Sequence, residues 1–133
     1  VIGAFVSGLD AGKIYNSWPL MGTSYFPDDS SLLNLLSFSI FNDPSLVQFI
    51  HRNLAYLILL FYLIIFFEIY SGKKSEYFKI ISIIGFLLIL QIVLGIITLL
   101  SGAEILVASM HQISSIFLVS SVINFVYINY NTS

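Results

Sequence analysis

One long apolar stretch, from Pro44 to Tyr70, constrains the fold of this chain most strongly. It reads PSLVQFIHRNLAYLILLFYLIIFFEIY, and about 20 such residues in an α-helix are enough to cross the hydrocarbon core of a bilayer. Near its start lie His51 and Arg52, which hydrocarbon disfavours, and ionisable residues inside a span by default mark a functional site. The stretch therefore predicts a membrane span with a site near one end.

Composition supports a membrane protein and limits the cofactors that it can hold. Of the 133 residues, 58% are hydrophobic and only 9% are charged, whereas soluble domains carry about a quarter charged residues. The sequence contains no cysteine, which excludes disulfides, iron–sulfur clusters and covalent attachment of a c-type haem. Any haem must then be a non-covalently bound b-type group. The predicted partner is a lipid bilayer, and nothing in the sequence suggests nucleic acid.

The hydrophobic pattern predicts an all-α, polytopic transmembrane helix bundle that forms a single membrane domain over residues 1–133. The predicted complete spans are Pro44–Tyr70, Phe78–Leu100 and Ile105–Ile128. The apolar segment Val1–Leu9 has no charged start, so it is interpreted as the end of a fourth span whose beginning lies outside this sequence. Its glycines, Gly3 and Gly8, either permit close helix approach or are simply tolerated in lipid.

The connection from Asp10 to Asp43 is long and polar, and it contains a hydrophobic segment of its own. Leucines at spacings of three and four predict a short amphipathic surface helix over Ser31–Phe41, capped by Ser30 or Ser31. Asp43 is a favourable N-cap for the next span, with Pro44 at the first helical position.

Basic residues predict the orientation of the bundle in the membrane. Lys73, Lys74 and Lys79 follow the first complete span, and the positive-inside rule places such a turn on the cytoplasmic or matrix side. The long connection and the Ser101–Glu104 turn would then share the outer side.

The only two histidines, His51 and His111, are predicted to lie at the same depth. Each is seven residues past the start of its span, counted from Pro44 and Glu104, which corresponds to about 10 Å along an α-helix. We interpret the two imidazoles as ligands of one metal centre, most simply the iron of a haem b. The alternative is that each histidine only hydrogen-bonds a neighbouring helix. Zinc or copper would need further ligands, for which Glu104 is the nearest candidate.

Other polar residues near the histidines have two interpretations each. Arg52 would reach a haem propionate or extend to the interface, and Gln48 would bond the His51 ring or a propionate, or connect two helices. Gln91, Gly95 and Thr98 share a helix face and are interpreted as packing contacts, with contact to a ligand as the alternative. Small residues that would leave room for a flat macrocycle are Ala55, Ala108, Ser114 and Ser115.

Four sequence blocks in order resemble the haem A synthase family of mitochondria and proteobacteria. They are GAFVSGLDAGKIYNSWPLM, VQFIHRNLAY, LQIVLGIITLL and the Met110-His111-Gln112 block. The resemblance implies eight transmembrane helices in two similar halves, of which this chain would be the second, and oxidation of a ring methyl of haem O to the formyl of haem A. His51 and His111 match the pair associated with a bound haem b.

The same resemblance implies which parts of that activity lie elsewhere. The substrate haem would be bound mainly by the other half, with haem O synthase and an electron donor as further partners, in a bacterial plasma membrane or the mitochondrial inner membrane. Gln48 stands where the first half has the glutamate of E-x-x-H-R, and a neutral amide cannot act as a general base. No catalytic residue is therefore expected in this chain, which alone would be inactive.

Two other functional classes remain open at this stage. One is a bis-histidine b-type membrane cytochrome subunit that exchanges electrons with quinol. The other is a scaffold or transporter segment whose histidines bridge helices. An adjoining four-helix unit with E-x-x-H-R would identify the synthase.

Overall fold

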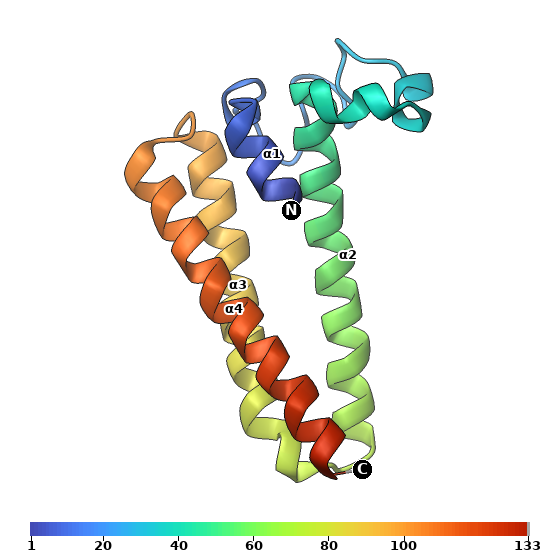
Figure 1. Cartoon of the computed structure of the whole chain (residues 1–133), viewed down its shortest axis with the longest axis vertical. Helices are drawn as coiled ribbons and strands as arrows, with labels where there is room; N and C mark the ends of the chain where they lie inside the picture. The colour runs from blue at the N-terminus through green and yellow to red at the C-terminus, as the bar shows by residue number, and fades with distance from the viewer. Residues whose placement is uncertain (133) are drawn as a thin grey trace.

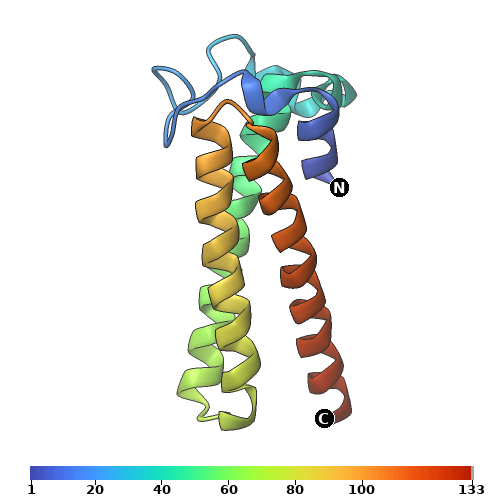
Figure 2. The ribbon, with the colours of Figure 1, turned by 90° about the vertical axis from the view of Figure 1, so that its left-hand side faces the viewer.

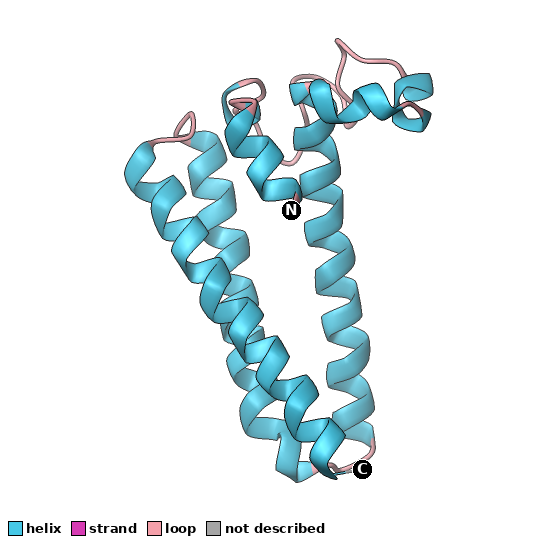
Figure 3. Cartoon of the chain, viewed as in Figure 1, coloured by secondary structure: helices cyan, strands magenta, loops and turns pink. Residues whose placement is uncertain are grey.

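The computed structural model describes residues 1–132, apart from the side chains of Ser39, Asn131 and Thr132, and its regular structure is helical (Figure 3). The α-helices are α1 (Ile2–Gly8), α2 (Pro44–Ser71), α3 (Phe78–Leu100) and α4 (Ile105–Thr132). Four short 3-10 helices connect them: η1 (Ala11–Lys13), η2 (Leu32–Leu36), η3 (Phe38–Asn42) and η4 (Ser75–Tyr77).

Three of these helices are long and apolar enough to cross a bilayer, which confirms the three predicted complete spans and an integral membrane protein. The second span has the predicted bounds, and the first continues one residue further, to Ser71. The third continues past Ile128 through the polar residues near the C-terminus, because asparagine and tyrosine at a helix end can face water without breaking the helix. Most large apolar side chains of the three helices are exposed on the bundle, as a lipid-facing surface requires.

The start of α2 shows the predicted capping. The Asp43 carboxylate accepts hydrogen bonds from the backbone N–H groups of Ser45 (3.0 Å) and Leu46 (3.1 Å), and Pro44 occupies the first turn. These bonds satisfy two of the four N–H groups that a helix start leaves without a partner. The cap therefore fixes where the first complete span begins.

The spans are held together differently at their two ends (Figures 1 and 2). Helices α3 and α4 run side by side, while α2 diverges from them and approaches them near the turn at residues 72–77. There Ile69, Tyr77 and Ile81 form a buried core. Partly buried apolar residues packed around this core are Tyr62, Phe66, Phe78, Ile80, Phe125 and Ile128. An apolar contact thus joins all three spans at the lysine-rich end.

The long connection folds over the other end of the bundle and has a small core of its own. Ala11 and Met21 are buried there, together with Leu46 and Val47 of the first turn of α2. The Asn16 amide donates to the Leu99 carbonyl oxygen (2.9 Å) at the end of α3. This contact confirms that the long connection and the Ser101–Glu104 turn lie at the same end.

The predicted surface helix over Ser31–Phe41 is wrong in detail, because the segment forms η2 and η3 rather than one α-helix. Ser31 caps η2 through the Leu33 N–H (3.3 Å), and Ser37 between the two is extended, with φ −105° and ψ 147°. Serine and asparagine side chains compete for backbone hydrogen bonds, which favours short turns over a continuous helix. The segment projects sideways from the start of α2 (Figure 1), with Leu36 89% and Phe38 93% exposed.

We predict that Gly85→Ala destabilises the lysine-rich end of the bundle. A Cβ at Gly85 would collide with the Tyr62 hydroxyl, which donates to the Ile81 carbonyl oxygen (3.2 Å). Overpacking of this kind typically costs about 1–3 kcal/mol, which thermal unfolding in micelles would detect. Gly8→Ala is the matched control, since a Cβ there meets no atom within 4 Å. Equal unfolding midpoints for the two variants would contradict the prediction.

Candidate functional site

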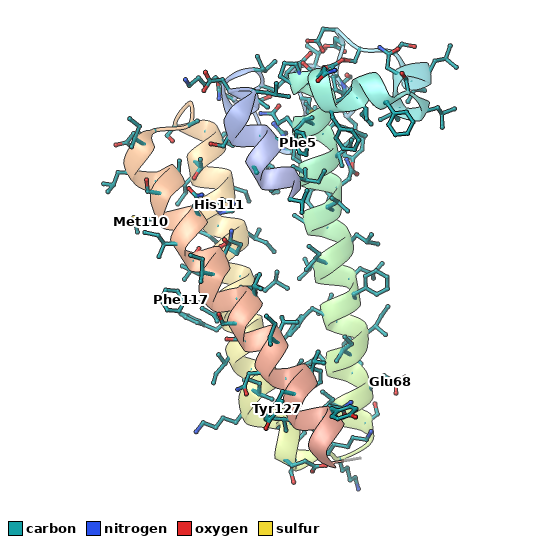
Figure 4. All side chains as sticks on the ribbon, viewed as in Figure 1. Phe5, Glu68, Met110, His111, Phe117 and Tyr127 are labelled. Atoms are coloured by element: carbon teal, nitrogen blue, oxygen red, sulfur yellow. The ribbon has the colours of Figure 1, made fainter. Side chains whose placement is uncertain are left out.

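The two histidines face each other across the bundle. His51 of α2 and His111 of α4 have ring centres 6.4 Å apart, and their ring planes are nearly perpendicular, at 83°. Figure 4 shows His111 on the inner side of α4, whereas Met110 and Phe117 point away from the bundle. The two rings thus lie close together, as their equal distances from the starts of their spans predict, and their role as metal ligands stays a prediction.

Glycines on neighbouring helices bring backbone close to both imidazole rings. A Cβ added at Gly3 of α1 would lie 3.8 Å from the Cε1 of His51, and one at Gly95 of α3 only 3.0 Å from the Cε1 of His111. Gly3 therefore lies at a close helix approach, one of the two roles considered for it. A Cβ added at Gly8 has no other atom within 4 Å, so Gly8 is not at a close helix approach.

A polar network between α3 and α4 holds His111. The Gln91 amide nitrogen donates to the His111 carbonyl oxygen (3.0 Å) and lies 3.2 Å from the Nε2 of the imidazole. The Ser114 hydroxyl donates to the Gln91 Oε1. The interpretation of Gln91 and Gly95 as packing residues is confirmed, because both join α3 to α4 at His111. The Thr98 hydroxyl donates to the Leu94 carbonyl oxygen of its own helix (2.7 Å).

One feature of the sequence indicates such a network. A glutamine within a membrane span must find a hydrogen-bond partner. Gln91 lies in the middle of the second span, and the opposite polar positions, His111 and Ser114, are one turn apart on the third. Which partner Gln91 takes depends on the rotation of α3 against α4, and that rotation is a tertiary property.

Arg52 and Gln48 are directed to the long connection. The Arg52 guanidinium donates to the carbonyl oxygens of Tyr15 (3.0 Å), Ser17 (2.9 Å) and Leu20 (3.2 Å). Gln48 is 2% exposed, and its amide nitrogen donates to the same Tyr15 oxygen (3.1 Å). Contacts of these two residues with a propionate remain a prediction.

Several polar atoms near the histidines are buried and have no hydrogen-bond partner among the described residues. They are the Gln48 Oε1, the Arg52 Nε and the His111 Nδ1. A buried polar atom without a partner costs free energy, and in native proteins it often marks a ligand position. The atoms are contributed by both helices that carry a histidine.

At the end of the bundle opposite the lysine-rich turn, the Asp29 carboxylate joins the long connection to α2. The Asp29 carboxylate accepts hydrogen bonds from the Tyr15 hydroxyl (2.9 Å) and the Ser45 hydroxyl (2.7 Å). Partial burial raises the pKa of Asp29, but the hydrogen bonds from Ser45 and Tyr15 outweigh it, so the pKa lies below its ordinary value. Burial and the bond to Asp29 raise the pKa of Tyr15. The connection is thus fastened at Asp29 as well as at Arg52.

The two histidines are too few to coordinate a bare metal ion on their own. Among residues 1–132, no group of three histidine, cysteine or acidic side chains is placed to hold a metal ion. A bare zinc or copper ion would therefore lack ligands here, and Glu104 does not complete a set. A macrocycle that already holds its metal would need only two protein ligands.

Comparison with known proteins gives a consistent family match. The model of the COX15-CtaA family, described as cytochrome oxidase assembly protein, matches residues 1–123. A haem A synthase of Pelagibacter ubique is 50% identical over 131 residues, which cover 98% of this chain and 38% of the relative. Haem A synthases of Rickettsia bellii and of the Wolbachia of Brugia malayi are each 41% identical, over 92% and 91% of this chain.

The chain spans little more than a third of the length of these relatives. No solved structure matches it.

We predict that Arg52→Gln loosens the long connection. The variant removes charge-assisted bonds to three carbonyl oxygens, and the loss of about 2 kcal/mol expected for such bonds corresponds to a roughly 30-fold rise in local opening. Hydrogen exchange of residues 15–22 in detergent micelles would report it. Lys13→Gln is the control, because Lys13 makes an exposed ion pair with Asp10. Unchanged exchange in the Arg52 variant would refute the role of the guanidinium.

Proposed function

Because the chain belongs to the COX15-CtaA family of cytochrome oxidase assembly proteins, we propose that it supplies the haem b-binding part of a haem A synthase. His51 and His111 are the axial ligands of the iron. The whole enzyme converts haem O to haem A, as the name of the relatives implies. The observation that carries the proposal is the 6.4 Å separation of the two imidazole rings.

That separation fits a metal held from two sides. Two imidazoles bonded to one metal from opposite sides, each through a nitrogen about 2 Å away, have ring centres roughly 6 Å apart. The ring-centre separation of 6.4 Å in this structure is close to that value. When bound, haem b with two histidine ligands supplies a one-electron couple and no open coordination position.

The neighbouring residues have supporting roles in this proposal. The unpartnered Arg52 Nε–H, one residue from His51, is available to a haem propionate. Gln48 is neutral and already donates to the Tyr15 carbonyl, so it supplies no general base. The long connection, fastened by both side chains, covers the outer end and limits the access of water to the histidines. Catalytic residues and the main substrate-haem contacts are proposed to lie outside this chain.

The expected low-spin haem spectrum is the direct test of the proposal. Purified protein supplied with haem is expected to show a b-type, low-spin absorption spectrum. His51→Ala and His111→Ala should each abolish that spectrum while leaving membrane insertion unchanged. Met110→Leu, which removes the neighbouring sulfur ligand candidate on the exposed face of α4, should retain it. A colourless wild-type preparation, or a histidine variant with an unaltered spectrum, would reject the proposal.

The orientation proposed from the lysines has a separate test. Because the sequence has no cysteine, Ser75→Cys and Thr23→Cys each introduce a single thiol, one at each end of the bundle. A membrane-impermeant maleimide should label the Ser75 variant only from the cytoplasmic or matrix side and the Thr23 variant only from the opposite side. The reversed pattern would invert the topology and leave the haem site untouched.

A further inference from the structure

Segment 31–42, which contains η2 and η3, exposes large apolar side chains at the end of the bundle opposite the lysine-rich turn. Leu36 and Phe38 are almost fully exposed. No charged residue stands between Asp29 and Asp43, so no side chain of the segment carries a charge that must stay in water. An exposed apolar surface of this kind marks a contact with lipid or with protein.

Helix α2 indicates the depth at which this segment lies. Gln48 and Glu68 are 20 residues apart on α2, which corresponds to about 30 Å of helix and to the thickness of the hydrocarbon core. With these two polar side chains at the borders of the core, Pro44 lies four residues, or about 6 Å, outside it. Because η3 ends at Asn42, directly before α2, the segment leaves the bundle at the level of the lipid headgroups.

The direction of segment 31–42 is set where it joins the bundle. Ile40 is buried, and the Phe41 ring packs against the ring of Phe5 in α1, with ring centres 5.2 Å apart. The Ser30 hydroxyl donates to the Asp43 carboxylate that caps α2 (3.0 Å). From there the segment projects sideways, across the direction of the spans (Figure 1). Its apolar side chains therefore lie along the plane of the membrane.

The backbone of the segment suits the headgroup region better than the hydrocarbon core. Its two 3-10 helices are each five residues long and are separated at Ser37, which is extended. Such short turns leave backbone N–H and C=O groups that need water or another partner, and hydrocarbon supplies none. Serine and asparagine alternate with the apolar residues, so polar and apolar groups are mixed as the interface requires.

Aromatic residues near the segment are of the types enriched at a membrane interface. The Trp18 indole N–H donates to the Tyr56 hydroxyl (3.2 Å), and the Tyr25 hydroxyl donates to the Asn53 side-chain oxygen. Trp18 and Tyr25 are about half exposed. Side chains with one apolar and one polar end are favoured at the level of the headgroups. They place the membrane interface at the same end of the bundle as segment 31–42.

We propose that segment 31–42 is an interfacial anchor that inserts Leu36 and Phe38 between the headgroups and the acyl chains of the leaflet at this end. Lipid is the occupant because the apolar surface is uncharged, lies at headgroup level and continues through Phe41 onto α1. The anchor holds the long connection, and with it the contacts of Arg52, at a fixed depth beside His51. This inference does not depend on haem.

Depth-dependent fluorescence quenching tests the anchor in the complete chain, reconstituted into phosphatidylcholine nanodiscs. Because the sequence has no cysteine, Phe38→Cys introduces a single thiol for an environment-sensitive fluorophore, and Leu36→Cys provides an independent second variant. Both labels should be quenched more by lipid brominated near the headgroup end of the acyl chain than by lipid brominated near the methyl end. Aqueous iodide should quench them little.

Two control positions calibrate the measurement. Thr23→Cys lies on the same connection at an exposed polar turn, so its label should be quenched by iodide. Ile64→Cys lies on an exposed face in the middle part of α2, so its label should be quenched most by lipid brominated near the methyl end. Leu36 and Phe38 are almost fully exposed, so replacing them removes little packing within the chain.

The outcomes separate the anchor from its alternatives. Quenching of the Phe38 and Leu36 labels by iodide as strongly as at Thr23 would place the segment in water and overturn the anchor. Labels protected from both iodide and brominated lipid would mean that a second copy or another polypeptide covers the segment, which would also overturn it. Shallow lipid quenching in a protein that shows no haem spectrum would support the anchor and reject the proposed function.

Discussion

The approach of two imidazoles between α2 and α4 is the contact on which the rest of this structure depends. The two helices belong to different parts of the bundle, since α4 packs along α3 while α2 diverges from that pair. Apolar packing joins them at the lysine-rich end, around Tyr77, and His51 meets His111 near the other. Polar groups in a span are retained where they have a partner or a task, and a shared metal would provide both.

The charge of Arg52 explains why the long connection is folded so closely onto the bundle. A guanidinium near the start of a span must be neutralised or hydrogen-bonded, and three backbone carbonyl oxygens do so here. The same contacts, with those of Gln48 and Asp29, hold residues 15–29 over the end of the bundle opposite the lysine-rich turn. Arg52 therefore determines both how the long connection folds and what surrounds His51.

The sequence predicted the spans, the Asp43 cap and the pairing of the histidines, because hydrophobic length and helical rise are local properties. It did not predict that Gln91 and Gly95 contact His111, since that depends on how α3 is rotated against α4. It was wrong about a continuous surface helix, because the Ser31 hydroxyl bonds the Leu33 N–H at the start of a short turn and Ser37 interrupts the segment in an extended conformation. Sequence spacing also could not predict that Arg52 and Gln48 bond backbone carbonyl oxygens of the long connection, because that contact depends on how the connection folds back onto α2.

The most direct measurement of the central claim is electron paramagnetic resonance of the ferric protein loaded with haem. If both His51 and His111 bind the iron, the ferric protein should give a low-spin signal. A high-spin signal would mean that one imidazole is not bound to the iron. That result would contradict coordination from both sides and leave the histidine pair as a contact between helices.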